Sequence, residues 1–171
     1  MLFKVYTDGS CSSNPGVGGY AFVIVSPRDN ALLKLSGCSP MTTNNQMELK
    51  AIVSALKHLQ YNFAINAREN VIQVYSDSAY CVNPLVQGWL KNWKKFDWKT
   101  RKGEEIKNLE LWKELDRVLD RMRAKVEFVK VKGHAGDEYN ELANDLAQNA
   151  TKRALERLKR QESEAANVSI K

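Results

Sequence analysis

Residues 2–25 read L-F-K-V-Y-T-D-G-S-C-S-S-N-P-G-V-G-G-Y-A-F-V-I-V, and this stretch decides the fold. Its first part, residues 2–8, is rich in β-branched and aromatic side chains that partly alternate, which predicts a strand ending at Asp8. Residues 9–16 carry glycine, serine, asparagine and proline and indicate a turn, whereas the apolar run over residues 20–25 is typical of a buried strand. We therefore expect two neighbouring strands, with an aspartate where the first one ends.

The segments that follow extend this sheet. Residues 31–38 predict a third, weaker strand, so the chain begins as an antiparallel meander. Residues 43–59 predict a helix, because apolar side chains recur there at spacings of three and four. Residues 71–75 predict a short strand, with Asp77 just beyond its end. A strand, a helix and a further strand in this order favour a parallel pair with a right-handed connection.

The second half of the chain continues to alternate between helix and strand. Helical pieces are expected over residues 79–103, a helix with one apolar face over residues 106–122, and a last strand over residues 126–131. A glycine-rich loop follows, and a final helix begins near Asp137. Ligand sites in such sheets gather at the carboxyl ends of strands, which is where two aspartates of this chain are expected.

Size and charge bound the organisation of the chain. With 171 residues, it has the length of one typical domain, which runs to roughly 100–200 residues. We expect this domain over residues 1–150, followed over residues 151–171 by a charged helical extension whose tail frays from residue 165. The net charge is +6 and the isoelectric point about 9.2, and this basic excess favours a polyanionic partner.

The cysteines and the apolar runs indicate where the protein works. Its three cysteines are scattered and lack the C-x-x-C spacing, so they are expected to be free thiols in a reducing compartment. No basic segment leads into an apolar one at the start of the sequence, and no apolar run approaches the ~18 residues of a membrane span. We expect a cytoplasmic protein without a membrane partner, and a monomer, because no exposed apolar stripe is predicted.

Three carboxylates are expected on three separate elements. They are Asp8 at the first strand, Glu48 near the start of the first helix and Asp77 after the fourth strand. Taken alone, each is equally typical of a helix cap or a surface charge. Together they supply the oxygen ligands that hard divalent cations prefer, as two-cation phosphodiester chemistry requires.

Six segments, in the same order, resemble the sequence motifs of the type 1 ribonucleases H. They are T-D-G-S-C-x-x-N-P-G (7–16), T-T-N-N-Q-M-E-L (42–49), Y-S-D-S-A-Y (75–80), W-L-K-N-W-K-K-F-D-W-K-T (89–100), K-N-L-E-L-W (107–112) and V-K-G-H-A-G (131–136). The resemblance covers residues 1–150. It implies an α/β ribonuclease H-like fold, with a five-stranded mixed sheet of three antiparallel and two parallel strands and helices on both faces.

The resemblance also implies an activity. The family cleaves the RNA strand of RNA·DNA hybrids endonucleolytically with two Mg²⁺ ions, for which Mn²⁺ is a substitute, and leaves 5′-phosphate and 3′-hydroxyl ends. By resemblance, Asp8 bridges the ions, and Glu48 and Asp77 complete the set. His134, in the glycine-rich loop, helps proton transfer or product departure, which suits an ordinary pKa of about 6.5, although an isolated loop histidine is usually plain surface. His58 has no such motif around it and is expected at the surface.

Asn144 departs from the family pattern. The last motif of the family reads N-x-x-x-D, and here Asn140 is followed at the aspartate position by Asn144. In one interpretation Asn144 binds metal or water through its neutral amide oxygen, and metal is held more weakly. In the other, the helix shifts so that Asp145 takes over. We prefer the first, because adjacent helical residues point about 100° apart and a shift would disturb the buried face. We expect an active enzyme; the alternative is a catalytically weakened or inactive hybrid-binding protein.

Basic and aromatic side chains are interleaved over residues 89–102. Lysines neutralise phosphates and tryptophans pack on sugars or bases, whereas the plainer interpretation is a solvated helix whose tryptophans enter the core. We expect a mixture of the two, in which some tryptophan faces pack and the lysines contact the DNA strand. Because such a segment suits a hybrid, it argues against a nuclease of the same fold that acts on other substrates. For residues 151–171, a solvated helix is preferred to a further nucleic-acid contact. The hybrid-binding residues predicted in the basic segment are Trp89, Lys91, Trp93, Lys94, Lys95, Trp98 and Lys99.

Polar residues near the first helix complete the predicted substrate contacts. By resemblance, Thr43 and Asn108 form a pocket for a phosphate of the DNA strand, and Met41 stands where the family often has an arginine, so one charge is lacking. Gln46 is expected to be ordinary polar surface. Amide side chains both donate and accept hydrogen bonds, which suits the RNA 2′-hydroxyl, although each alone is typical of a turn or cap. The residues expected to read that hydroxyl are Asn14, Asn44 and Asn45.

Overall fold

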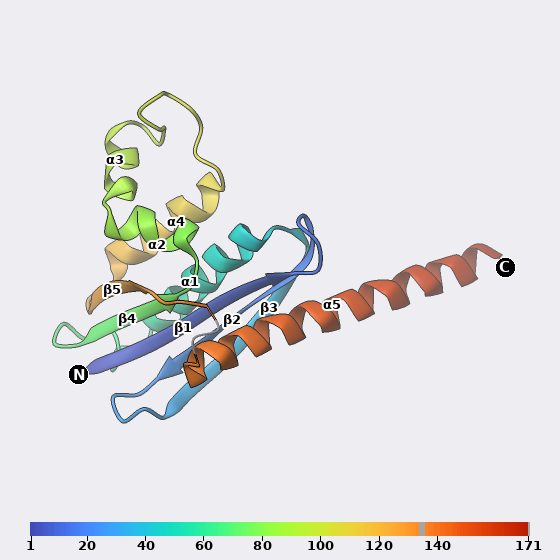
Figure 1. Cartoon of the computed structure of the whole chain (residues 1–171), viewed down its shortest axis with the longest axis horizontal. Helices are drawn as coiled ribbons and strands as arrows, with labels where there is room; N and C mark the ends of the chain where they lie inside the picture. The colour runs from blue at the N-terminus through green and yellow to red at the C-terminus, as the bar shows by residue number, and fades with distance from the viewer. Residues whose placement is uncertain (134–135, 171) are drawn as a thin grey trace.

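The computed structural model describes residues 1–133 and 136–170 of the chain. Strands and helices alternate as the sequence predicts, and Figure 1 labels them along the chain. Helices cover both faces of one mixed sheet, so the predicted fold class is confirmed. The elements are β1 (Leu2–Cys11), β2 (Gly16–Val25), β3 (Ala31–Thr42), α1 (Asn44–Gln60), β4 (Val71–Ser76), α2 (Ala79–Val86), α3 (Trp89–Lys95), α4 (Leu109–Arg121), β5 (Lys125–Lys130) and α5 (Glu138–Ile170).

The five strands lie in the order β3-β2-β1-β4-β5. β1, β2 and β3 pair antiparallel, and β4 and β5 join β1 in parallel, as expected. β1 does not end at Asp8 but continues to Cys11, because its last residues pair with the glycine-rich start of β2. The parallel pairing with β4, however, stops at Tyr6 and Tyr75. Asp8 therefore lies just beyond the point where β1 and β4 separate.

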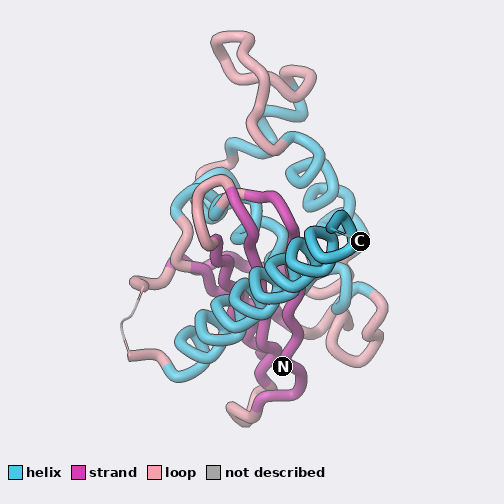
Figure 2. Tube along the Cα trace, turned by 90° about the vertical axis from the view of Figure 1, so that its right-hand side faces the viewer, coloured by secondary structure: helices cyan, strands magenta, loops and turns pink. Residues whose placement is uncertain are grey.

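Each face of the sheet is covered differently. α1 packs on β1 and β2 and against α4 on one face, and their apolar sides form the main core, in which Trp112 and Leu115 of α4 are almost completely buried. α5 alone crosses β1, β2 and β3 on the other face, as Figure 2 shows in cyan over the magenta strands. β1 is thus covered by α1 on one face of the sheet and by α5 on the other.

α5 approaches the sheet closely where β2 carries Gly19. A β-carbon added there would lie 2.7 Å from the carbonyl oxygen of Ala147 and 2.8 Å from the backbone nitrogen of Thr151. Both contacts are backbone atoms, so only glycine allows the helix to lie this close to the strand. The position of α5, and of every side chain that it presents to β1, thus depends on this glycine.

α5 is longer than the sequence predicts. Residues 165–170, which were expected to fray, are helical, and the second half of the helix projects beyond the sheet (Figure 1). Leu155 and Leu158 are half-buried, whereas residues 159–169 are exposed. Within the described residues, none of the helices combines the length and the apolar character that crossing a membrane requires. The three cysteines are free, as predicted.

Candidate active site

Three carboxylates from three elements meet at the centre of the sheet. Asp8 comes from β1, Glu48 from the first turns of α1, and Asp77 from the residue after β4. One oxygen of each lies within 4.8 Å of the others, and Asp8 is only 4% exposed. The structure thus brings together the three acids that were singled out from the sequence. Asp8 and Asp77 both follow the last paired residues of β1 and β4, and Glu48 joins them from α1.

Two glycines allow the acids to approach one another. A β-carbon on Gly9 would lie 2.3 Å from the backbone nitrogen of Glu48, so only glycine lets the start of α1 pack beside Asp8. A β-carbon on Gly133 would lie 3.0 Å from Oδ2 of Asp77, so the loop after β5 passes directly over that carboxylate. The spacing of the acids is therefore set by backbone contacts as well as by the side chains themselves.

Glu48 carries the clearest electrostatic signature. Its Oε2 atom is buried and has no hydrogen-bond partner among the described residues. Burial raises the pKa of Glu48 well above 4.5, and the neighbouring charge of Asp8, a hydrogen bond with Asp8 and the charge of Asp77 raise it further. A buried, unpaired carboxyl oxygen beside two other acids fits a divalent cation, which would supply the missing partner and offset the repulsion. These three residues can hold such an ion.

Asn144 takes the fourth position, next to Asp8. Its amide nitrogen donates a hydrogen bond of 2.6 Å to Oδ2 of Asp8, and the residue is half-buried. Asp145 is exposed, so the helix has not shifted to bring its carboxylate inward. Asn144, and not Asp145, thus lies at the acids, as preferred from the sequence, but it is its amide nitrogen that faces Asp8, and binding of metal or water through the amide oxygen stays a prediction. His134, the predicted proton-transfer residue, lies outside the described residues.

The comparisons with known proteins identify the family. The family model described as RNase H matches residues 2–152. The chain belongs to the ribonuclease H family. A ribonuclease H from Syntrophomonas wolfei is 45% identical over 148 residues, which cover 86% of this chain and 94% of the relative. The resemblance inferred from the six motifs is therefore confirmed, and the chain is an enzyme of the ribonuclease H class.

Two solved ribonucleases H share the fold and bear on the site. LC9-RNase H1, a type 1 RNase H with the type 2 active-site motif, has a TM-score of 0.72 and 28% identity and covers 90% of this chain and 73% of its own. LC11-RNase H1, solved in complex with an RNA/DNA hybrid, has a TM-score of 0.70 and 27% identity and covers 90% of this chain and 99% of its own.

The start of α1 carries the threonine and the amides that were expected to contact the substrate of this ribonuclease H. Thr43 is the N-cap of the helix, and its hydroxyl accepts a hydrogen bond of 3.2 Å from the backbone nitrogen of Gln46. Asn14 accepts a bond of 3.0 Å from the backbone of Asn44, which joins the β1–β2 turn to α1. Asn45 is exposed beside them.

Gln46 was expected to be plain surface, and this expectation is wrong. The residue is half-buried, and its side chain accepts from the backbone of Thr43 at 3.2 Å and from the hydroxyl of Thr42 at 2.8 Å. It also donates to Oδ1 of Asn108 at 3.0 Å. A glutamine three residues after a threonine is a capping-box signal, so the first part of this arrangement was readable from the sequence.

The basic segment forms α3 and the loop that follows it in this ribonuclease H. Trp93 packs edge-on against buried Trp112, with ring centroids 5.3 Å apart, whereas Trp89 is 42% exposed. Lys94 forms ion pairs with Asp116 at 3.1 Å and Asp120 at 3.8 Å, so it fastens α3 to α4. The mixture of packed and free aromatic rings follows the expectation for this segment. The predicted lysines that are exposed without a described ion pair are Lys91, Lys95 and Lys99.

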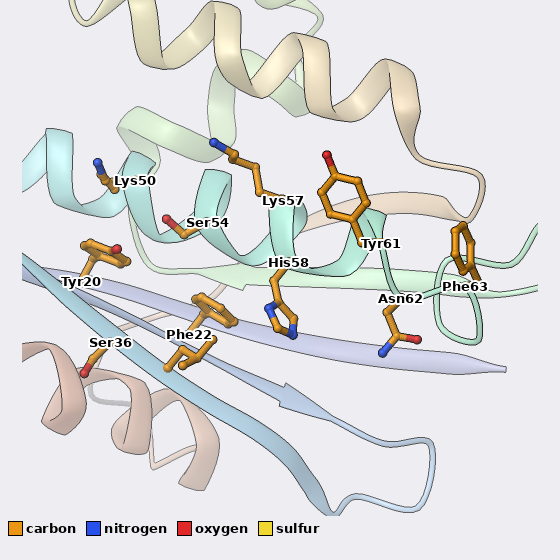
Figure 3. Close-up of a pocket in the computed structure, with 11 residues that line it drawn as sticks. Tyr20, Phe22, Ser36, Lys50, Ser54, Lys57, His58, Tyr61, Asn62 and Phe63 are labelled. Atoms are coloured by element: carbon orange, nitrogen blue, oxygen red, sulfur yellow. The ribbon is translucent and has the colours of Figure 1, made fainter.

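A broad groove of about 1040 Å³ lies away from the acidic cluster, between α1 and strands β2 and β3. Figure 3 shows His58 and Phe22 turned toward one another in this groove, with Tyr61 and Phe63 beyond them. His58 is exposed, as expected. None of the three carboxylates lines the groove, so it is separate from the ribonuclease H site.

Proposed function

We propose that this chain is an endonuclease that hydrolyses the RNA strand of RNA·DNA hybrids with two Mg²⁺ ions, leaving 5′-phosphate and 3′-hydroxyl ends, and that Mn²⁺ can replace Mg²⁺. The observation that carries the proposal is the meeting of Asp8, Glu48 and Asp77 within 4.8 Å. The family membership supports it, and so does the related LC11-RNase H1, which was solved with an RNA/DNA hybrid.

The side chains in and beside the acidic cluster each have a role in this proposal. Asp8, Glu48 and Asp77 would hold the divalent cations, which would supply activation of a water molecule and neutralisation of charge on the leaving oxygen. Asp8 is oriented from both sides, because the backbone of Gly9 donates to its Oδ1 at 2.9 Å and Asn144 donates to its Oδ2 at 2.6 Å. Glu48 must lose its proton before it can act as a ligand. Asn144 would offer a cation its amide oxygen, which requires the amide to give up its hydrogen bond to Asp8.

The polar residues around the start of α1 and the basic segment suit a hybrid. The side-chain amides of Asn14 and Asn44, held together by a bond from the backbone of Asn44 to Oδ1 of Asn14, are suited to an RNA 2′-hydroxyl, and Thr43 and Asn108 to a phosphate of the DNA strand. The lysines and the exposed Trp89 of the basic segment suit the same strand further along. His134 is proposed to help proton transfer. Recognition would then depend on shape and on the 2′-hydroxyl rather than on base sequence.

The amide at position 144 favours one alternative to this function, namely a hybrid-binding protein with little catalytic activity. A neutral amide supplies less charge to cations than a carboxylate would. The related LC9-RNase H1 carries the type 2 active-site motif on a type 1 enzyme, which supports variation of the active-site motif within this fold. We therefore prefer the active enzyme with a weakened metal site.

Cleavage of a hybrid with labelled RNA, in Mg²⁺ or in Mn²⁺, tests the proposal. We expect internal cuts in the RNA strand, products with 5′-phosphate ends, and loss of cleavage in Asp8→Ala. Tight hybrid binding without cleavage by the wild type, together with cleavage by Asn144→Asp, would establish the alternative. Cleavage that persists in Asp8→Ala would contradict the acidic cluster as the reaction site.

We further propose that the enzyme is a cytoplasmic monomer. The three free thiols support a reducing compartment. Size-exclusion chromatography with light scattering checks the oligomeric state, and a mass close to 19.4 kDa is expected. A mass twice as large would contradict the monomer.

A further inference from the structure

The hydroxyl of Tyr80 is the centre of a hydrogen-bond network. It accepts from Nδ2 of Asn108 at 2.8 Å and from Nε1 of Trp112 at 3.2 Å, and it donates to the carbonyl oxygen of Lys107 at 3.2 Å. A phenolic oxygen has two acceptor positions and one donor hydrogen, so its capacity is fully used. Because Trp112 is only 1% exposed, this network is anchored in the core.

The side-chain amide of Gln46 is the centre of a second hydrogen-bond network. Asn108 lies between it and the hydroxyl of Tyr80 and bonds to both. The amide oxygen of Gln46 accepts from the hydroxyl of Thr42, the last residue of β3, and from the backbone nitrogen of Thr43, the N-cap of α1, and its nitrogen donates to Oδ1 of Asn108. One amide therefore joins the N-terminus of α1 to the residue that opens α4. The bond spans 62 positions of the sequence, so it is a tertiary link.

Asn108 is held at both ends of its side chain. Its oxygen is fixed by Gln46 and its nitrogen by Tyr80, and its backbone adopts a left-handed conformation with φ of 57° at the N-cap of α4. The side chain makes no capping hydrogen bond to its own helix. It keeps one amide hydrogen for a ligand, and the hydroxyl hydrogen of Thr43 is likewise not used in capping, because that oxygen acts there as the acceptor.

The phosphate pocket expected at Thr43 and Asn108 would therefore rely on neutral donors. Met41, which stands where a cation would help, is 68% exposed and brings no charge. Neutral hydrogen bonds are weaker than charge-assisted ones and depend more on orientation. A pocket of this kind binds a phosphate only if its donors are already fixed in direction.

We propose that Gln46 and Tyr80 are positioning residues, which hold the amide of Asn108 so that Asn108 and Thr43 bind one DNA-strand phosphate together. This inference rests on the proposed function, because it takes the hybrid as the substrate. Neither residue touches the substrate; each acts through Asn108. The link also ties the phosphate pocket to the helix that carries Glu48.

Tyr80→Phe, which removes one oxygen atom, tests the proposal. We expect the KM for a hybrid, and the Kd for it in EDTA, to rise by about three- to tenfold, the range of one ordinary hydrogen bond, with kcat changed by less than about twofold. Tyr75→Phe is the matched control, because that hydroxyl is also half-buried and donates to Gln73 at 2.7 Å on β4. Equal rises in both variants would overturn the proposal, since they would reflect a general loss of stability.

A double-mutant cycle shows whether the effect passes through Asn108. Tyr80→Phe should raise Kd in the wild type and leave it unchanged in Asn108→Ala. Gln46→Glu keeps the capping box but cannot donate to Asn108, and its effect should likewise vanish in Asn108→Ala. Effects that persist in the Asn108→Ala background would overturn the positioning role.

The two readouts separate this inference from the proposed function. If Asn108→Ala alone leaves Kd unchanged, the pocket is not used and the inference fails, although wild-type cleavage would still support the enzyme. If the wild type does not cleave a hybrid, the proposed activity fails, whereas the binding cycle in EDTA still tests the positioning role.

Discussion

At the scale of single residues, we expect the hydrogen bond between Asn144 and Asp8 to stabilise the metal-free protein. In Asn144→Asp, a donor 2.6 Å from Asp8 becomes a fourth acid. We expect the metal-free protein to lose about 1–3 kcal/mol of stability, because a hydrogen bond is replaced by repulsion. We expect divalent cations to bind about tenfold more tightly, a gain of about 1.4 kcal/mol. Urea unfolding in EDTA and calorimetric titration with Mn²⁺ measure the two effects.

Asp145 provides the matched control for this change. It neighbours Asn144 but is exposed. Asp145→Asn should leave both the metal-free stability and the Mn²⁺ affinity close to those of the wild type. A marked loss of metal affinity in this variant would mean that Asp145, and not Asn144, serves the site.

Glu48 makes the metal-free protein sensitive to pH. Its pKa is raised in the folded state, so the stability it contributes is complete below about 4.5, and it is lost as the pH rises through the folded value. Glu48→Gln removes this loss. We therefore expect urea unfolding in EDTA, between about pH 5 and about pH 8, to show a steeper fall in stability for the wild type than for Glu48→Gln. Exposed Glu141→Gln is the control, and an equally flattened profile there would contradict the assignment.

At the scale of elements, the lysines of α3 and its loop divide into two kinds. Lys91, Lys95 and Lys99 are exposed, whereas Lys94 is paired with Asp116 and Asp120 on α4. Replacing the first three by alanine should weaken the salt dependence of hybrid binding. The slope of log Kd against log salt concentration should fall by about 1 for each phosphate that a lysine no longer neutralises. The measurement is Kd against salt concentration.

Lys94→Ala should act differently. This change breaks the ion pairs that fasten α3 to α4, so we expect lower stability with a nearly unchanged salt slope. A slope that falls as much as in the other lysine variants would show that Lys94 leaves its acids to contact the hybrid.

The elements also show what the sequence could and could not predict. The regular apolar spacing on α1 and the aspartates near strand ends were sufficient to locate the helix and the three acids. β1 was predicted too short, because Gly9 and Ser10 are turn residues whose pairing depends on the facing strand. The links from Gln46 to Asn108 and from Lys94 to α4 were missed, because such contacts join positions far apart in the chain.

At the scale of the whole molecule, we expect the projecting part of α5 to be dispensable for the site. The family match ends at residue 152, and residues 159–169 are exposed. Removing residues 159–171 should leave kcat, KM and the salt slope of hybrid cleavage within about twofold, because the packed residues Leu155 and Leu158 remain. Steady-state kinetics at two salt concentrations checks this. A clear rise in KM at the higher salt would instead assign the extension a role in substrate binding.

The projecting part of α5 is also a rigid place to attach a probe, because it continues the helix that packs on the sheet. Residues 159–170 span about 18 Å as a continuous helix, at about 1.5 Å for each residue. A fluorophore attached to the new thiol of a Ser169→Cys variant, in which exposed Cys38 and partly exposed Cys11 have been replaced, would turn with the protein instead of swinging on a flexible tether. The depolarisation of its light would then report directly how the whole particle tumbles, alone or on a long duplex.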